Sequence, residues 1–277
     1  MSARVFLATD YGLDDEFVGV LHAVIARVAP EVRVIDLSHG IAAFDVEGGA
    51  ALLARSAPHL GPGVLCAVVD PGVGSLRRRV ALEVVAAASR PGILVGPDNG
   101  LLVEAALALG GVRRAVDIDP GSLGVHDGSA TFDGRDVFAP AAALLASGTP
   151  LEALGAPIEP SSLVTLDAPY SARRALPDGR VAIVATARWI DRFGNVALSL
   201  PGSTLEGVHT VGLAVGGDDA LVRVVRTFSD LEEGSAGLLC DANGSVALVV
   251  ANASAASRFD LVAGDRVELV GTFGRPE

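Results

Sequence analysis

Apolar positions follow two different spacings in the first 155 residues. Short apolar runs at 4–8, 32–37 and 63–69 predict strands, and the last of these is continuous enough for a strand buried on both faces. Residues 14–28 and 45–57 instead carry apolar side chains at helical spacing. Strand and helix therefore alternate along this part of the chain.

The alternation continues with two further strands within 77–86 and 92–95, a turn at 96–100, and helices at 101–108 and 136–147. Strands that alternate with helices are typical of a sheet covered by helices. The first part of the chain is therefore predicted to be an α/β domain with a mostly parallel central sheet.

The pattern changes after about residue 155, where Pro, Ser and Arg mix without periodicity. From Val181 onward, strand-like runs of roughly six to eleven residues are separated by Gly, Asp and Asn turns. This predicts an all-β, barrel-like domain. We expect an α/β domain at 1–160, a linker at 161–180 and the β domain at 181–277.

Composition and charge limit the classes of function. Half of the 277 residues are hydrophobic and 19% are charged, which excludes an intrinsically disordered chain. The net charge is −12 and every basic residue is Arg, so neither nucleic-acid binding nor chemistry that needs a Lys is expected. Cys66 and Cys240 lie in separate apolar runs, which predicts two buried thiols.

No apolar run reaches the ~18 residues of a membrane-spanning helix. The first residues reach an acidic turn before a signal-type segment of useful length can form. We therefore expect a cytoplasmic protein without a membrane partner.

Polar side chains follow four of the predicted strands. They are Asp10, Ser38, His39, Asp70, Asp98 and Asn99. Ligands of open α/β sheets bind beyond the carboxyl ends of the strands, so these side chains are candidates for a site beside the Arg77–Arg79 cluster. Each of them alone is better explained as a helix cap or a turn residue, but their position at several strand ends favours a site.

Three later segments are also polar. The segment GSATFDGRDVF places Asp133, Arg135 and Asp136 close together, IDRFGNV places Asp191 and Asn195 around a Gly turn, and VVANASAAS ends a strand in small residues. Small residues let a flat ligand approach the backbone, but a hairpin turn and a packed strand end explain the same residues.

Motifs for other chemistries are missing from the sequence. It contains no GxGxxG after the first strand, no GxSxG and no HExxH. The five His residues show no metal-ligand spacing, so no metal site is expected.

Seven separated segments carry a family resemblance. In chain order they are TDYGLDDEFVGVLHAVI, VIDLSHGIAAFDVEGGAALL, AVVDPGVGSLRRRVALEV, VGPDNGLL, TFDGRDVFAPAAA, WIDRFGNV and NASAAS. Together they resemble the S-adenosyl-L-methionine hydrolases, or SAM hydroxide adenosyltransferases, which are relatives of the 5′-fluorinase and 5′-chlorinase.

The resemblance implies an N-terminal α/β domain and a C-terminal β-barrel domain. It also implies a homotrimer whose active sites lie between the first domain of one subunit and the second domain of the next. The implied reaction converts S-adenosyl-L-methionine and water to adenosine and L-methionine, with no metal and no cofactor.

The resemblance assigns roles to single residues of the first domain. Asp10 matches the carboxylate that holds the ribose hydroxyls, and Phe44 matches the ring near the sugar and the sulfonium. Asp70, followed seven positions later by Arg77, is the hydrolase pattern, whereas the halogenases carry Tyr in that block. The pattern favours water over halide as the nucleophile.

In the second domain, the matched substrate-binding positions are Asp191, Phe193, Asn195, Ala253 and Ser254. Asp191 and Asn195 correspond to contacts with the methionine moiety and with the adenine or amino-acid edge. Ala253 and Ser254 fall where the family's backbone meets adenine.

One position departs from the family pattern. The hydrolases carry His in a TFHGRD block, where this chain has Asp133, and His126 lies seven residues earlier. Two neighbouring aspartates raise the pKa of one of them. We hypothesise that Asp70 orients the water, Arg77 fixes Asp70, and Asp133 takes or relays the proton, with His126 as an alternative acceptor.

Three other functions remain open at this point. A calcium-dependent nucleoside hydrolase is suggested because TDYGLDD is similar to that family's DTDPGxDD metal-binding segment, although Ala8 stands in place of its first Asp. The other two are a 5′-halogenase of the same superfamily and a catalytically idle binder of adenosine or S-adenosyl-L-methionine.

Overall fold

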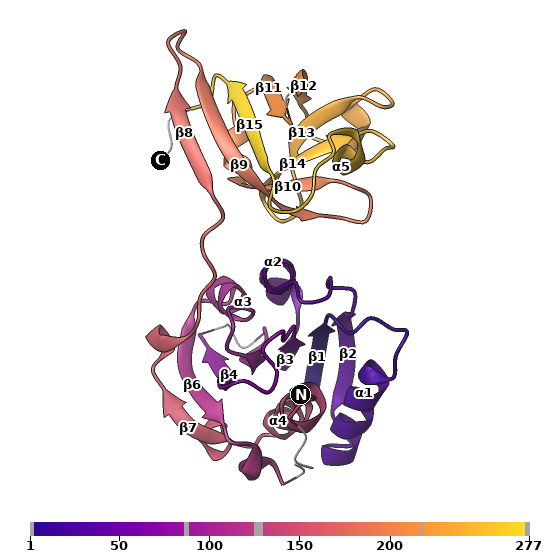
Figure 1. Ribbon diagram of the computed structural model, residues 1–277, viewed down its shortest axis with the longest axis vertical. Helices are drawn as coiled ribbons and strands as arrows, with labels where there is room; N and C mark the ends of the chain where they lie inside the picture. The colour runs from indigo at the N-terminus through magenta and orange to yellow at the C-terminus, as the bar shows by residue number, and fades with distance from the viewer. Residues whose placement is uncertain (1–2, 86–88, 125–129, 217, 275–277) are drawn as a thin grey trace. The chain divides into compact units, whose positions relative to one another are not determined.

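The chain divides into two units, Met1–Leu166 and Asp167–Glu277 (Figure 1). The computed structural model describes residues 3–85, 89–124, 130–216 and 218–274.

A seven-stranded sheet forms the centre of the first unit, in the order β2-β1-β3-β5-β4-β6-β7. Its strands are β1 (Arg4–Thr9), β2 (Arg33–Ser38), β3 (Val64–Val68), β4 (Arg79–Val84), β5 (Ile93–Pro97), β6 (Val112–Ile118) and β7 (Gly155–Ile158). The pairings from β2 to β5 are parallel, and those that join β5, β4, β6 and β7 are antiparallel. The predicted α/β fold class is confirmed, with a mixed sheet.

Helices cover both faces of this sheet (Figure 1). They are α1 (Phe17–Val28), α2 (Val46–Ser56), α3 (Val103–Ala108) and α4 (Ala139–Ala146). Successive strand residues point to opposite faces, so Val5 and Leu7 pack in the core under α1 and α4, while Phe6 and Ala8 pack in the core under α2 and α3. A run of apolar residues is therefore needed to fill both cores.

The helix predicted at 136–147 has two parts. A π-helical turn, η3 (Gly134–Phe138), precedes α4. Isolated π-helical turns within α-helices are frequent at functional sites. The turn carries the buried Asp136 and follows directly after the buried Asp133.

Strands β6 and β7 were not predicted. Arg113 and Arg114 of β6 are exposed, which interrupts the apolar pattern, and β7 is a four-residue edge strand with a Pro at its centre. Short edge strands of this kind carry little signal in a single sequence.

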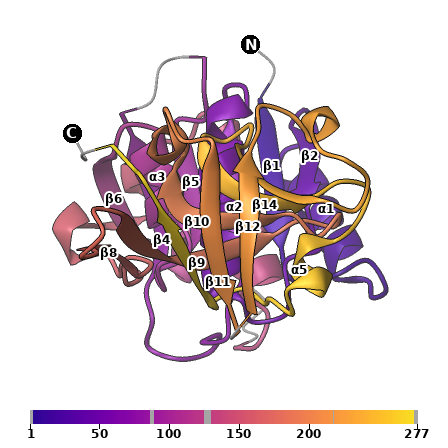
Figure 2. The same ribbon diagram turned by 90° about the horizontal axis from the view of Figure 1, so that it is seen from above.

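The second unit is a closed barrel of seven strands, which confirms the predicted barrel-like all-β class. The strands are β9 (Val181–Ile190), β10 (Val196–Pro201), β11 (Thr210–Val215), β12 (Asp218–Val224), β13 (Ala236–Cys240), β14 (Ser245–Val250) and β15 (Arg266–Gly271). Their order is β10-β14-β13-β12-β11-β15-β9, and pairing of β9 with β10 closes the barrel. Helix α5 (Ala255–Arg258) lies beside β14 (Figure 2).

Part of the expected linker at 161–180 is a strand. Residues Ser171–Ala175 form β8, which pairs antiparallel with the first half of β9 and extends the barrel sheet beyond it. Asp178 and Gly179 make the turn between the two strands, and Gly179 has a φ of 85°. The strand has mostly exposed side chains, so it lacks the apolar alternation that predicts strands.

The two cysteines differ in environment. Cys66 is buried in β3, and burial raises the pKa of its thiol to about 12. Cys240 is exposed at the end of β13, so the expectation that both are buried is wrong. The last residue of a barrel strand can leave the core even when the strand before it is apolar. The described helices all fall short of the length and apolarity that a membrane span needs.

Candidate active site

A cavity of about 520 Å³ opens in the first unit at the carboxyl ends of β1 and β3. Its walls also include the loop after β2 and the segment that leads into η3. The lining residues are Asp10, Tyr11, Phe17, Ala43, Phe44, Asp70, Val73, Thr131, Phe132, Asp133, Gly134 and Arg135. Four residues that the sequence nominated, Asp10, Phe44, Asp70 and Asp133, thus share one cavity.

Two carboxylates of this cavity are joined by arginines. Arg77 donates from Nε to Asp70 Oδ1 at 2.7 Å, and its Nη2 donates to both Asp70 Oδ2 and Asp133 Oδ2. Arg79 donates from Nε to the same Asp133 oxygen at 2.8 Å. Two negative and two positive charges therefore form one continuous ion-pair network.

The network is withdrawn from solvent. The side chains of Asp70, Arg77 and Asp133 are 5%, 9% and 2% exposed. Burial raises the pKa of Asp70, and the charge of Asp133 adds to the rise, while Arg77 opposes it. Burial alone would lower the pKa of Arg77, but its bonds to Asp70 and Asp133 raise it. Asp70 is therefore a stronger base than an ordinary aspartate.

Asp10 holds the backbone of Phe44. Its Oδ2 accepts a hydrogen bond from the Phe44 N–H at 2.9 Å. Phe44 has a φ of 68°, in the left-handed region that aromatic residues rarely occupy, and the residue is 73% exposed. The carboxylate thus supports a strained loop that presents an aromatic ring at the cavity.

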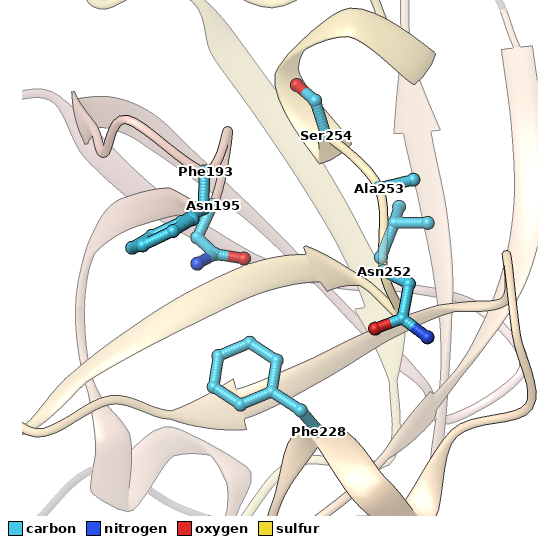
Figure 3. A pocket seen from close by; sticks show the side chains of 7 residues that line it. Phe193, Asn195, Phe228, Asn252, Ala253 and Ser254 are labelled. Atoms are coloured by element: carbon cyan, nitrogen blue, oxygen red, sulfur yellow. The ribbon is translucent and has the colours of Figure 1, made fainter.

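A second cavity of about 520 Å³ lies in the barrel, where the β9–β10 loop faces the segment after β14. Figure 3 shows Phe193 and Asn195 on one wall, Asn252, Ala253 and Ser254 on the opposite wall, and Phe228 between them. Four of the five residues nominated in the second domain line this cavity, and aromatic rings with amide groups suit a flat polar ligand.

Asp191, the fifth nominated residue, shapes the β9–β10 loop from within. Its Oδ1 accepts hydrogen bonds from the N–H groups of Phe193 and Asn195 at 2.8 and 2.9 Å, and its Oδ2 accepts from Asn195 Nδ2 at 2.8 Å. Gly194 lets the loop pack against Ser254. Any larger residue would clash there, since a Cβ at Gly194 would lie 2.0 Å from Ser254 Oγ.

The other strand-end residues are structural in the described geometry. Asp98 accepts from Arg78 Nε at 2.7 Å and from the Val164 N–H at 2.9 Å, and Asn99 bonds the carbonyl of Val69. His39 Nδ1 lies 2.8 Å from Thr9 Oγ1. These side chains tie strand ends and loops together and do not line the cavity.

Several residues of the two cavities and of the ion-pair network were not nominated individually from the sequence. Tyr11 and Phe132 directly adjoin Asp10 and Asp133, so their neighbours could have pointed to them, and Arg79 belongs to the Arg cluster noted above. Phe228 and Asn252 carry no comparable signal. His126 lies outside the described residues. Among those described, no three His, Cys, Asp or Glu side chains are grouped as metal ligands.

Family models match both units of the chain. The SAM hydroxide adenosyltransferase N-terminal domain matches residues 5–155, and the C-terminal domain of the same family matches residues 185–268. The chain belongs to the SAM hydroxide adenosyltransferase family.

Individual relatives agree with this family. The (R)-S-adenosyl-L-methionine hydrolase of Salinispora tropica is 46% identical over 96% of this chain and 97% of its own length. The fluorinase of Nocardia brasiliensis is 28% identical over 94% of each chain. A crystal structure of a conserved protein from Thermotoga maritima has a TM-score of 0.84 and 29% identity, and covers 96% of this chain and 99% of that one.

Membership of the SAM hydroxide adenosyltransferase family removes the nucleoside hydrolase alternative, which depended on the TDYGLDD segment alone. The TFDGRD block still departs from the TFHGRD pattern described above. In this member, Asp133 occupies the block and is bonded to two arginines.

Proposed function

We propose that the protein hydrolyses S-adenosyl-L-methionine, with water displacing methionine from C5′ of the ribose to give adenosine and L-methionine. The observation that carries this proposal is Asp70, a buried carboxylate of raised pKa that lines the cavity and is held by Arg77. The similarity to a named hydrolase over nearly the whole chain supports it.

The residues of the first unit would divide the work as follows. Asp10 and Phe44 bind the ribose and lie beside the sulfonium, and Asp70 accepts a hydrogen bond from the attacking water. A lone pair of the water oxygen forms the bond to C5′ as the C5′–S bond breaks. The electron pair of the C5′–S bond stays on sulfur, which leaves as neutral methionine. Asp70 takes the proton, in place of Asp133 as hypothesised from the sequence, because the Asp133 oxygen is already bonded by both Arg77 and Arg79. Arg77 orients Asp70, and the charge of Asp133 raises the basicity of Asp70 while anchoring Arg77.

The residues of the barrel cavity would bind the rest of the substrate. We assign adenine and the methionine moiety to Asn195, Phe193, Ala253 and Ser254, with Asp191 setting the shape of their loop. The resemblance further suggests a homotrimer in which this cavity completes the site of a neighbouring subunit. Light scattering of the purified protein tests the trimer, for which we expect a mass of three chains. A cytoplasmic location stays a prediction.

The decisive experiment incubates purified protein with S-adenosyl-L-methionine in ¹⁸O-labelled water. We expect adenosine that carries the label at its 5′ hydroxyl, together with unlabelled methionine. Formation of 5′-halo-adenosine in the presence of chloride or fluoride would instead identify a halogenase. Tight substrate binding with no adenosine released over hours would identify an idle binder.

The raised pKa of Asp70 predicts the acid side of the pH profile. Asp70 must be ionised to accept a proton, so kcat/KM falls as the pH is lowered through its pKa, which lies above the ordinary value of 3.8. Measuring kcat/KM from about pH 4 to 9, with circular dichroism to verify folding, tests this. A rate that stays constant down to pH 4 contradicts the assignment.

Asp191→Ala is expected to weaken substrate binding about tenfold and to change kcat little. The substitution removes the acceptor of three hydrogen bonds that order the 191–195 loop, each worth about 0.5–1.5 kcal/mol. Asp191→Asn keeps one acceptor oxygen and is the matched variant, with a smaller loss. Calorimetric titration with adenosine gives the affinities. Equal affinity in all three proteins would rule out this role for the loop.

A further inference from the structure

Tyr11 follows Asp10 and lines the same cavity as Asp70 and Asp133. Its ring is held by two other aromatic rings. The ring centroids of Tyr11 and Phe17 are 5.6 Å apart, those of Tyr11 and Phe132 are 5.8 Å apart, and the Phe132 ring meets Tyr11 edge-on. Such contacts fix the orientation of a ring, so the direction of the phenol hydroxyl is fixed as well.

The hydroxyl of Tyr11 is available to a ligand in the cavity. None of the described residues gives it a hydrogen-bond partner, and the one polar contact of Tyr11 is its own N–H, which donates to Thr9 Oγ1 at 3.1 Å. A Cβ placed on Gly134 would lie 2.3 Å from the Tyr11 hydroxyl oxygen. The oxygen therefore lies against the start of the π-helical turn η3, one residue after Asp133.

The charges around Tyr11 keep the phenol protonated. Burial raises its pKa, and the carboxylates of Asp10, Asp70 and Asp133 raise it further. A neutral phenol cannot act as a base near neutral pH. The surrounding negative charge attracts its hydrogen, so the lone pairs of its oxygen remain free to accept a hydrogen bond.

We propose that Tyr11 is a further catalytic residue of this site, which accepts a hydrogen bond from the attacking water and so orients its lone pair toward C5′. This proposal rests on the proposed function. The water donates one hydrogen to Asp70 and the other to the Tyr11 oxygen. As the O–C5′ bond forms and the C5′–S bond breaks, the first hydrogen passes to Asp70 as a proton. The second stays on the oxygen as the 5′ hydroxyl of adenosine.

Two acceptors hold an attacking water in a better-defined orientation than one. One acceptor leaves the molecule free to rotate about its hydrogen bond, whereas two fix the plane of the water and the direction of its lone pair. Correct orientation of reacting groups is a large source of rate enhancement, and a small misplacement of the reacting atom is costly. The rigid aromatic cluster suits Tyr11 to this task.

Tyr11→Phe tests the proposal, since it removes the hydroxyl and keeps the ring contacts with Phe17 and Phe132. We expect the single-turnover rate of adenosine formation to fall about 10- to 100-fold, with the Kd for S-adenosyl-L-methionine changed less than about twofold. Tyr170→Phe is the matched control and should keep the wild-type rate. Tyr170 is the other tyrosine of the chain, and it is 46% exposed with its ring 4.2 Å from Arg266 Cζ.

Gly134→Ala provides a second test, which displaces the Tyr11 hydroxyl without changing Tyr11 itself. In the otherwise unchanged protein the added methyl must displace the Tyr11 hydroxyl, so we expect a loss of rate similar to that of Tyr11→Phe. When Gly134→Ala is combined with Tyr11→Phe this clash is gone, and the remaining neighbours at 3.2 and 3.3 Å need to move by only a few tenths of an ångström. The double variant should therefore be within about twofold of Tyr11→Phe alone.

Each result has a definite reading. If the wild type is active and Tyr11→Phe has the same rate, the assignment of Tyr11 is overturned while the proposed function stands. The same follows if the rate loss of the double variant equals the product of the losses of the two single variants. A loss of rate accompanied by an equal loss of substrate affinity also overturns it, because the hydroxyl would then serve binding. A wild-type protein that releases no adenosine overturns the proposed function together with this inference.

Discussion

Asp70→Asn is expected to lower the single-turnover rate of adenosine formation at least about 100-fold, because removing a general base typically costs about 10²- to 10⁴-fold. The substitution keeps the size and hydrogen-bonding shape of the side chain while removing its ability to take a proton. The Kd for S-adenosyl-L-methionine should change less than about threefold. Rapid-quench kinetics and calorimetric titration measure the two quantities separately.

Asp178→Asn is the control for this variant. Asp178 lies at the exposed β8–β9 turn, where it pairs with Arg180, far in the sequence from any residue of the first-unit cavity. Its substitution should leave the rate unchanged. If Asp70→Asn reduced the affinity as much as the rate, Asp70 would be a binding residue and the general-base assignment would be lost.

Arg77→Ala is expected to lower both the rate and the free energy of unfolding. Arg77 bonds Asp70 and Asp133, whose side chains are almost fully buried, so its removal leaves two carboxylates close together and short of one cation. Breaking a buried ion pair in this way typically costs about 3–5 kcal/mol of stability. Denaturant unfolding followed by circular dichroism measures the change.

Arg77→Lys should rescue little of this loss, since an ammonium cannot reproduce the paired N–H geometry of the guanidinium. Arg113→Ala is the matched control. Arg113 is 68% exposed and pairs with Glu83 at 3.5 Å, so it should change stability by less than about 1 kcal/mol. Equal destabilisation by both Ala variants would show that the network contributes no more than a surface pair.

The elements that a single sequence predicts are those whose periodicity arises from burial. Helix α1 buries one stripe of side chains and strand β3 is buried on both faces, so both patterns are visible in the sequence. Strand β8 is mostly exposed, and β7 is a short edge strand interrupted by Pro157. Their pairing is determined by neighbouring strands, which a local pattern does not contain.

The candidate site shows the same division. Polar residues that follow buried strands, such as Asp10 and Asp70, were found because ligands of open α/β sheets bind beyond the carboxyl ends of the strands. The same argument nominated Asp98 and Asn99, which are engaged in holding loops. Arg79 and Tyr11 adjoin nominated residues in the sequence, which marks their positions. Their roles come from the bond of Arg79 to the distant Asp133 and from a Tyr11 hydroxyl that no described residue bonds, and only a three-dimensional structure contains that information.

The closure of the barrel constrains how the β9–β10 loop of the second unit can vary. Ile190 and Val196, which flank residues 191–195, are paired with each other at the seam between β9 and β10. Inserting or deleting a residue in the loop would shift this pairing and turn alternate side chains of one strand out of the core. Divergence among relatives should therefore exchange side chains within a loop of constant length, so that selectivity for ligands can change while the barrel is preserved.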